Sequence, residues 1–521
     1  MSVRTRFAPS PTGYLHIGGV RTALFCWLLA QRDGGKFVLR IDDTDDARNR
    51  VEAVKPIIDG FRWLGVNWDE GPTDDGGGES VGPHQPYFQG QRNPIYEAAA
   101  MKLLAEGKAY PDYTTPQQQE AAREQAKLAR KPYVHRGTNR DVSAEENVKQ
   151  YAAKKAPLLL KVEPGQKVLF TDAVKGKHET NTDTIRDPML LRGPDDNGLC
   201  RAVYNFATVV DDIAFGITHV VRAVEHLENT PTQILMYQAL GATLPTFGHV
   251  PQVYYNGEKM SKRKTPPLSA DEIAKFKACG WTDDEIKGRD DLNIIAVAYY
   301  KEIGYLPEAI INYLCRLGWS LDAETEYMTV DTLKQHFTLD RVTDAPGNYD
   351  SKKLFWIQGE HMKLVPTAEK MERCIPFLQR AKLIGDTLDS DTRLTLTKII
   401  DASGDRIKLF SDIVAFATPI LKSEIDRDPK ATEKAFKDPS SKGLLTEFTE
   451  VLKSAEPFDA PTLDKLAHEF VAAKGLKLGA LQLPLRVAVT GTGMGFGLFD
   501  TLAILGKETV LRRLARQMEI V

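Results

Sequence analysis

The sequence predicts an α/β protein, with a parallel sheet in the amino-terminal half and a largely all-α carboxyl-terminal region. Residues 3–42 read as strand, loop, helix and strand, which is the opening unit of a parallel nucleotide-binding sheet. Residues 204–256 resume this alternation of apolar strand-like runs and helical patterns. Beyond about residue 360 the apolar spacing is helical, with few strand signals. A chain of 521 residues is long enough for several domains and cores.

The opening unit contains the first candidate ligand site. A tight loop is expected after the strand at 3–7, because two prolines and Gly13 follow it. An amphipathic helix is expected over 20–32, and His16 lies where the loop ends. Backbone N–H groups and the helix dipole favour an anion at a helix amino terminus. This end of the predicted helix is therefore a candidate phosphate site.

Further signals follow along the chain. The second strand, predicted over 36–42, ends in acidic residues, and side chains past a strand's carboxyl end face the ligand crevice of a parallel sheet. From about Gly107 the pattern changes, with a polar helix over 117–130, which indicates an insertion between two halves of the sheet. The glycine-rich run at 490–497 lacks the Lys-Ser/Thr of a phosphate-binding P-loop, so we interpret it as a tight turn between helices.

Composition excludes several classes of protein. The 42% hydrophobic and 27% charged residues are typical of a globular protein, and no apolar run approaches the roughly 18–20 residues that span a bilayer. With no apolar leader or transit segment, we expect a cytoplasmic protein with no membrane partner. The net charge of −3 argues against indiscriminate coating of nucleic acid, although a local basic face is sufficient for RNA. The five cysteines are scattered without Cys-x-x-Cys spacing, which indicates reduced thiols.

Two motifs in a fixed order carry the strongest signal. The first, at 4–19, reads RTRFAPSPTGYLHIGG, and the second, far downstream at 259–263, reads KMSKR. They resemble the "HIGH" and "KMSKS" signatures of class I aminoacyl-tRNA synthetases. The first resembles the glutamyl branch in detail, because that branch typically has Gly at the position of Gly19. Residues 204–231 and 484–508 also match the family pattern.

The resemblance implies a domain organisation. It predicts a Rossmann-like parallel-sheet catalytic domain that is split by an acceptor-binding insertion, followed by a helical anticodon-binding region. The expected parts are the first catalytic half at 1–106, the acceptor-end-binding insertion at 107–203, the second catalytic half at 204–256, the KMSKR loop and stem-contact domain at 257–359, and the helical anticodon-binding region at 360–521.

The resemblance also implies the reaction and its partners. L-glutamate attacks ATP to give glutamyl adenylate and diphosphate, and the 3′ end of tRNA(Glu) then takes the glutamyl group with release of AMP. We expect Mg²⁺ with ATP, held mainly by phosphates and water, and a monomeric enzyme. Whether tRNA(Gln) is also a substrate is left open, and the anticodon-reading residues are not identified.

Site residues are carried over by position. His16, Lys259, Lys262 and Arg263 are expected to act in catalysis. ATP binding is assigned to His16, Gly18, Gly19, Lys259, Met260, Ser261 and Lys262. Glutamate binding is assigned to Arg6, Ala8, Ser10, Asp42, Tyr204, Thr208 and Arg222. No protein metal site is expected.

The sequence departs from the family pattern at four places. Asp42 stands where the family usually has Glu, and Val224 stands where it usually has an acid. Some members bind zinc through Cys after an Ala-Tyr pair; here Asp112 and Thr114 follow that pair, so we predict no zinc. The charged segment around 266–295 is longer than the family usually has, and no role is assigned to it.

Three other classes of protein share part of this pattern. A short relative that glutamylates a modified tRNA nucleoside lacks the carboxyl-terminal region that this chain has. Small nucleotidyltransferases with the same two signatures are much shorter. A non-catalytic tRNA-binding paralogue is disfavoured by intact His16 and Lys262, and a pyrophosphate-exchange assay distinguishes it.

Overall fold

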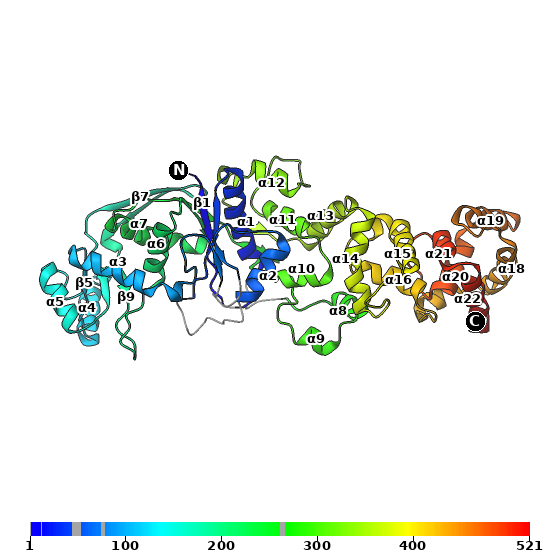
Figure 1. The fold of residues 1–521 in the computed structure, drawn as a ribbon, viewed down its shortest axis with the longest axis horizontal. Helices are drawn as coiled ribbons and strands as arrows, with labels where there is room; N and C mark the ends of the chain where they lie inside the picture. Colours follow the sequence, from blue (N-terminus) through cyan, green and yellow to red (C-terminus); the bar gives the residue numbers. More distant parts are fainter. Residues whose placement is uncertain (1, 12, 44–53, 74–78, 261–265, 521) are drawn as a thin grey trace. The chain divides into compact units, whose positions relative to one another are not determined.

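The computed structural model describes residues 2–11, 13–43, 54–73, 79–260 and 266–520 (Figure 1). These residues form two compact units. The first contains Met1–Thr265, Ile295–Ala298 and Ile310–Asp350, and the second contains Pro266–Ile294, Tyr299–Ala309 and Ser351–Val521. None of the helices in the described part of the chain is long and apolar enough to cross a bilayer.

A six-stranded sheet forms the centre of the first unit. Its order is β2, β1, β10, β11, β7, β8, and all neighbours are parallel except the last pair. The strands are β1 (Arg4–Phe7), β2 (Lys36–Leu39), β7 (Lys167–Asp172), β8 (Gly176–Asn181), β10 (His219–Ala223) and β11 (Thr246–Val250). The predicted parallel α/β sheet is thus confirmed.

The strand order changes direction between β1 and β10. From β1 the chain passes through α1 (Ile17–Arg32) to β2 on one side, and much later it fills the other side with β10 and β11. In open parallel sheets, ligands bind beyond the carboxyl ends of the strands at such a switch point. Phe7, Leu39 and Ala223 end the three strands that surround it.

Helix α1 begins three residues earlier than the sequence pattern indicated, because His16 caps it. Its side chains from Val20 to Ala30 are buried almost without exception, since the helix packs on β1, β2 and β10 and also on α12 (Val330–His336). The predicted strand at 36–42 pairs as a strand only to Leu39, which leaves Arg40 and Asp42 in the crevice.

The segment 107–203 is only partly separate from the main sheet. The hairpin of β7 and β8 lies within it and extends that sheet beyond β11. This pairing was not predicted from the sequence pattern. The rest of the segment surrounds a three-stranded sheet of β5, β6 and β9. Its elements are β5 (Ala109–Pro111), α4 (Pro116–Leu128), α5 (Ala144–Ala153), β6 (Leu158–Leu160) and β9 (Met189–Leu191).

The other elements of the first unit complete its core and its small sheets. They are α2 (Val54–Leu64), β3 (Gly71–Pro72), β4 (Ser80–Val81), α3 (Asn93–Ala105), α6 (Tyr204–Ala214), α7 (Thr230–Ala239), β12 (Val253–Tyr255), β13 (Glu258–Lys259) and β14 (Gly347–Asn348). Both units contribute residues to α10 (Val297–Ile303) and α11 (Pro307–Arg316).

The second unit is helical, as the sequence predicted. Its carboxyl-terminal helices share one apolar core that includes Leu445, Phe448, Leu485 and Leu502. Between α20 and α21 the chain makes the predicted turn, and Gly491 adopts φ +76°, which favours glycine. The helices are α13 (Ser351–Lys363), α14 (Thr367–Arg380), α15 (Ser390–Ser403), α16 (Asp412–Leu421), α17 (Pro429–Ala435), α18 (Ser440–Ser454), α19 (Ala460–Ala473), α20 (Gly479–Thr490), α21 (Leu498–Leu505) and α22 (Lys507–Ile520).

The long segment after the KMSKR motif also belongs to the helical unit. It forms α8 (Ala270–Ala278) and α9 (Asp283–Lys287), and each begins with a capping box. The Arg380 guanidinium stacks 3.8 Å from the ring centre of Trp281, and Lys275 pairs with Asp412 at 2.6 Å. Phe276, which lies between Lys275 and Trp281 in the sequence, is buried. The extra residues are therefore part of a packed core.

Candidate active site

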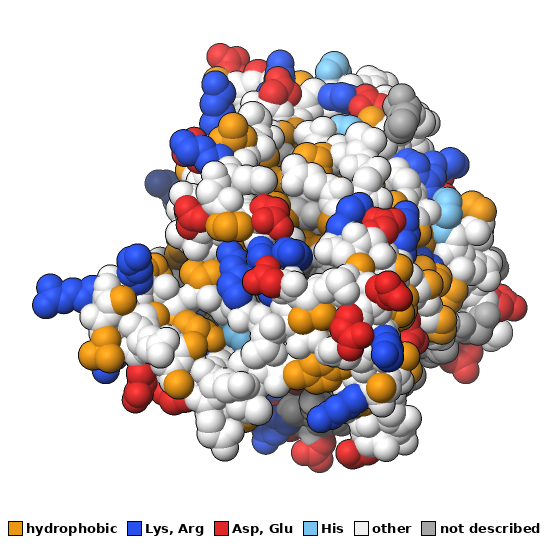
Figure 2. Space-filling view, turned by 90° about the vertical axis from the view of Figure 1, so that its left-hand side faces the viewer, with side chains coloured by type: hydrophobic (Ala, Val, Ile, Leu, Met, Phe, Trp, Pro, Cys, Tyr) orange, Lys and Arg blue, Asp and Glu red, His pale blue; other side chains and the backbone are white. Residues whose placement is uncertain are grey.

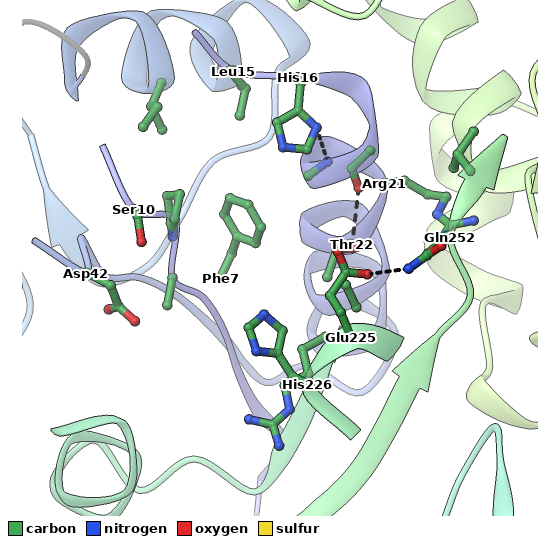
Figure 3. Close-up of a pocket in the computed structure, with 18 of the residues that line it drawn as sticks. Phe7, Ser10, Leu15, His16, Arg21, Thr22, Asp42, Glu225, His226 and Gln252 are labelled. Atoms are coloured by element: carbon green, nitrogen blue, oxygen red, sulfur yellow. Dashed lines mark hydrogen bonds between the residues drawn. The ribbon is translucent and has the colours of Figure 1, made fainter. Parts of the chain in front are cut away.

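A cavity of about 410 Å³ opens beyond the carboxyl ends of β1 and β10 (Figure 3). It brings together residues that the sequence analysis assigned separately to ATP and to glutamate. Ser261, Lys262 and Arg263 lie outside the described residues. The predicted site residues that line the cavity are Arg6, Ala8, Ser10, His16, Gly18, Gly19, Asp42, Tyr204, Thr208, Arg222, Lys259 and Met260.

His16 is the residue that caps α1. Its backbone is extended, and its Nδ1 accepts a hydrogen bond of 3.0 Å from the Gly19 N–H. A neutral imidazole with an accepting Nδ1 carries its proton on Nε2. A Cβ atom at Gly19 would lie 3.4 Å from that Nε2, so the absence of a side chain at Gly19 leaves space beside this edge of the ring. His16 is therefore arranged to donate a hydrogen bond from Nε2.

The amino end of α1 is partly satisfied by the protein itself. The Ile17 N–H donates to the Ile295 carbonyl oxygen at 2.8 Å, and the Gly19 N–H donates to His16. Since only the first few N–H groups of a helix lack partners within it, these two bonds reduce what remains for an anion. Any phosphate at this end would therefore depend on the His16 imidazole as well as on the helix.

Four buried charges join the two halves of the sheet. The Arg6 Nε donates to both oxygens of Asp212, at 3.1 and 3.2 Å. The fully buried Arg40 donates to both oxygens of Asp42, at 2.6 and 3.2 Å, and to Asp212 at 3.0 Å. Burial raises the pKa of Asp42 to about 6, although the Arg40 charge opposes that shift. Each of these arginines thus has a carboxylate partner.

Arg222 differs from Arg6 and Arg40 in its partners. It is only 5% exposed, and its three nitrogens donate to His249, Gln233 and Thr230 at 2.8 to 3.0 Å. None of these partners is a carboxylate, and in the described part of the chain Arg222 makes no ion pair. Burial lowers the pKa of Arg222. A buried cation without an anion is costly, so this position favours an anionic ligand.

Polar side chains near Arg222 complete this end of the cavity. The Thr208 Oγ1 is buried and has no hydrogen-bond partner among the described residues. The Tyr204 hydroxyl lies 3.3 Å from Nδ1 of His226, and burial lowers the pKa of His226 to about 4. His226 is therefore neutral near pH 7 and can accept a hydrogen bond from Tyr204.

Lys259 reaches the cavity from β13 and contacts an acid there. Its Nζ lies 2.8 Å from Oε1 of Glu225, whose other oxygen accepts a 3.1 Å bond from Gln252. Burial acts to raise the pKa of Glu225, but these hydrogen bonds hold it below its ordinary value. The Lys259 charge is thus balanced by Glu225 in the ligand-free protein.

The cavity has two chemically different ends. In Figure 3, Ser10 and Asp42 lie on one side of Phe7, and Thr22, Glu225 and Gln252 lie on the other, with His16 at the start of α1. The first side leads to the buried charge network, and the second leads to Lys259. This arrangement suits a ligand with a charged amino-acid part and a phosphate part.

The segment where some relatives bind zinc is crosslinked by hydrogen bonds instead. Asp112 accepts from Thr114 at 2.5 Å and contacts Nε2 of His135 at 2.7 Å, and Nδ1 of His135 lies 2.8 Å from the Tyr133 hydroxyl. Within the ranges that the structure describes, no three His, Cys, Asp or Glu side chains are grouped to hold a metal ion. The absence of zinc stays a prediction.

The face of the first unit that carries α4 and α5 has mixed charge (Figure 2). Lys and Arg side chains are interspersed there with Asp and Glu, with basic side chains gathered near the middle of the face, and apolar side chains lie between the charged ones. This pattern agrees with the near-neutral composition of the chain.

Comparison with known proteins identifies the family. Residues 2–278 and 278–356 match the family described as "tRNA synthetases class I (E and Q), catalytic domain", and residues 369–518 match "Anticodon binding domain". The "Glutamate--tRNA ligase 1" of Caldanaerobacter subterraneus subsp. tengcongensis is 38% identical over 522 residues, which covers 100% of this chain and 98% of that protein. The chain belongs to the glutamyl-tRNA synthetases.

Other relatives of this synthetase span its whole length. The glutamate–tRNA ligase of Anaeromyxobacter sp. (strain Fw109-5) is 38% identical, with 99% of both chains covered. Among solved structures, a glutamate–tRNA ligase from Elizabethkingia meningosepticum in complex with its amino acid matches with a TM-score of 0.79. The two are 29% identical, and the match covers 100% of this synthetase and 99% of that chain.

Several residues of the cavity were not selected from the sequence. Arg40 lies beside the predicted Asp42, but its burial between Asp42 and Asp212 depends on α6, more than 160 positions away. Glu225 and His226 were noted as part of a matching pattern, without a role. A charged residue inside the otherwise apolar strand predicted over 36–42 was the available signal for Arg40.

Proposed function

We propose that this synthetase binds L-glutamate with its carboxylates at Arg6 and Arg222 and forms glutamyl adenylate at the start of α1. The observation that carries this assignment is the charge of the cavity. At the amino-acid end of the cavity, Arg6 and Arg40 are paired with Asp42 and Asp212, whereas Arg222 has neutral partners, so this end has one uncompensated positive charge. Glutamate, with two carboxylates and one ammonium group, has one net negative charge.

The amino-acid part of the site then has separate groups for each charge. The Arg6 and Arg222 guanidinium groups each take one carboxylate, and the resemblance favours Arg6 for the side chain. Asp42, with Ser10 and the backbone at Ala8, takes the ammonium group. Thr208 offers a buried hydroxyl that has no partner among the described residues.

Adenylate formation is a displacement at phosphorus, so no protein nucleophile is required. His16 donates from Nε2 to a phosphate oxygen, and Gly18 and Gly19 allow the phosphate to approach α1. Lys259 leaves Glu225 for the phosphates, together with Met260 and with Ser261, Lys262 and Arg263, for which the proposal rests on sequence alone. Magnesium supplies charge neutralisation when it is bound to the ATP phosphates.

The second step transfers the glutamyl group to tRNA. The class I family uses ATP, and its members charge tRNA. We assign the acceptor end to the segment 107–203, the stem to 257–359 and the anticodon to 360–521, where the anticodon-binding family matches 369–518. tRNA(Glu) is the proposed substrate, and a monomeric cytoplasmic enzyme stays a prediction.

The same charges explain the choice of glutamate over glutamine. Glutamine has nearly the same shape, but its amide offers no negative charge to the guanidinium that binds the substrate side chain. A site that is built for a charged or polar partner rejects its loss by about 10⁴-fold or more. No separate editing domain is required for this discrimination.

The test is glutamate-dependent ATP–pyrophosphate exchange with the wild type and with Arg6→Ala, each measured with and without tRNA. We expect Arg6→Ala to abolish most of the exchange and to lower the glutamate-to-glutamine ratio of kcat/KM. Arg4→Ala is the matched control, because Arg4 lies on the same strand but pairs with Glu70 outside the cavity.

Each outcome of this experiment has a defined meaning. An unchanged ratio in Arg6→Ala would assign side-chain recognition elsewhere, with Arg222 as the next candidate. A wild-type chain that supports no exchange under either condition would favour a non-catalytic tRNA-binding role instead.

A further inference from the structure

Three buried polar side chains form a line across three neighbouring strands behind the cavity. Arg222 on β10 stands in register with His249 on β11, and Asp172 ends β7 on the far side of β11. The Arg222 Nε donates to Nε2 of His249 at 3.0 Å, and Nδ1 of His249 lies 2.6 Å from Oδ2 of Asp172. The side chains of His249 and Asp172 are completely buried.

The donors and acceptors in this line determine which ring nitrogen of His249 carries the proton. Arg222 has only donors, so Nε2 of His249 must accept, and the single proton of the neutral ring must lie on Nδ1. Asp172 accepts that proton's hydrogen bond. Burial lowers the pKa of His249, which keeps the ring neutral, and hydrogen bonds hold the pKa of Asp172 low although burial acts to raise it. The carboxylate thus selects the tautomer.

Asp172 is itself held firmly in place. Its Oδ1 accepts three backbone N–H groups, from Val174, Lys175 and His249, at 2.9 to 3.0 Å. The two oxygens therefore have separate tasks, because Oδ1 anchors the end of β7 and Oδ2 faces the imidazole. A change that alters Oδ2 alone can change the proton position without loosening the anchor.

We propose that Asp172 and His249 are positioning residues that orient the Arg222 guanidinium for a carboxylate of the substrate. Neither touches the cavity, and both act through Arg222. The inference rests on the proposed role of Arg222 in glutamate binding and deepens it. It also gives β7 a function, since a strand from the segment 107–203 sets the geometry of the amino-acid pocket.

The decisive variant is Asp172→Asn. The amide oxygen keeps the three backbone bonds, but the amide nitrogen faces Nδ1 and donates to it. His249 must then carry its proton on Nε2, where it opposes the Nε–H of Arg222. Loss of one hydrogen bond to a charged group predicts a rise in KM for glutamate of about 10- to 100-fold. Since ground-state binding is affected, kcat should change little.

Glu70→Gln is the matched control. Glu70 is a buried acid that lies 2.7 Å from Nδ1 of His84 and outside the cavity, so the same carboxylate-to-amide change is made beside another histidine. Its KM for glutamate should equal that of the wild type. A similar rise in both variants would overturn the proposal, because any buried acid would then have the same effect.

A second variant tests the tautomer itself. In Asp172→Asn/His249→Gln, the glutamine oxygen accepts from Arg222 whatever residue 172 is, so KM for glutamate should return toward the wild-type value. An unchanged KM in Asp172→Asn, or no recovery in the double variant, overturns the positioning role. Failure of the proposed function would be seen differently, as a wild type without glutamate-dependent exchange or as Arg222→Gln with normal KM for glutamate.

Discussion

Arg222 illustrates how a single side chain can prepare a site for a charged ligand. Its guanidinium is buried among neutral partners, whereas the neighbouring Arg6 and Arg40 have carboxylates. Such a charge lowers the stability of the ligand-free fold, because a desolvated cation lacks an anion. Binding of a carboxylate removes that penalty. The same unpaired charge that destabilises the ligand-free fold therefore favours an anionic ligand over a neutral one.

His16 allows two roles to be separated by substitution. His16→Ala should slow adenylate formation about 10²–10³-fold, the range for losing one preorganised donor to developing charge. His16→Asn should show the same loss, because the Asn oxygen can still cap α1 but has no Nε2 proton. Single-turnover rates and thermal melts of both variants provide the measurement. A normal rate in His16→Asn would mean that His16 acts only as a helix cap.

The raised pKa of Asp42 predicts that glutamate binding depends on pH. Burial raises its pKa to about 6, so the carboxylate becomes neutral as the pH falls through about 6. Loss of its contact with the ammonium group should raise KM for glutamate below that pH, and Asp42→Asn should have a high KM that no longer varies between pH 8 and 5.5. KM is measured by pyrophosphate exchange across this range.

Protonation of Asp42 at low pH does not destabilise the fold, so unfolding caused by this group does not explain a rise in KM for glutamate. A carboxyl whose pKa is higher in the folded state than its ordinary 3.8 stabilises the fold fully below about 4, and this contribution is lost as the pH rises through about 6. Circular dichroism at each pH provides the control. A flat KM in the wild type would contradict the assignment of Asp42.

At the scale of elements, the two ends of the cavity depend on different kinds of structure. The end that we propose for the ATP phosphates depends on the loop-to-helix junction before α1, where the Ile295 carbonyl oxygen accepts from the Ile17 N–H. The end that we propose for the amino acid depends on strand register, because Arg6, Arg222 and His249 are side chains of β1, β10 and β11. Local motifs therefore predict the first end more readily than the second.

From the hydrogen bonds in the segment after β5, we predict that this part of the fold does not need zinc. Asp112, Thr114, His135 and Tyr133 are joined by hydrogen bonds of 2.5 to 2.8 Å at the place where some relatives have thiolates. Dialysis against EDTA should leave the thermal melting temperature unchanged, and elemental analysis should find substoichiometric zinc. One tightly held zinc per chain, or a lower melting temperature after EDTA, would contradict this.

Much of the fold could be predicted from local patterns, whereas most of the cavity residues came from the family resemblance. His16 and Asp42 also stand next to a predicted helix start or strand end, which places them at the ligand edge of a parallel sheet, but Arg6 was assigned through the resemblance alone. Asp172 and Arg40 could not be paired with their partners, because those partners are 77 and 172 positions away. Likewise, the period-two burial along β7 is the pattern of any half-exposed hairpin strand. The sequence therefore did not show that β7 and β8 join the main sheet beside β11.

At the scale of the whole molecule, the helical unit is discontinuous in sequence. Pro266–Ile294 packs with helices that begin after residue 350, and Phe276 and Trp281 are almost fully buried there. A cut between the catalytic part and the helical region at residue 350 would therefore divide a core.

Truncation tests this organisation. A chain that ends at residue 350 should aggregate, because the apolar side chains of α8 and α9 would be exposed. Replacing residues 268–292 in the same truncated chain by a short Gly/Ser linker should restore a soluble monomer. Size-exclusion chromatography of both proteins provides the measurement. Equal solubility of the two would contradict the assignment of the segment to the helical core.

The strand order also has a consequence for synthesis on the ribosome. β1 pairs with β10, and Arg4 bonds to a residue 214 positions later. At about 5–20 residues per second, β1 and β2 wait roughly 10 to 40 s before that neighbour has been translated. During this interval the nascent chain presents an open β edge, which is a template for wrong pairing. We therefore expect the emerging amino-terminal half to depend on chaperones until β10 has been translated and pairs with β1.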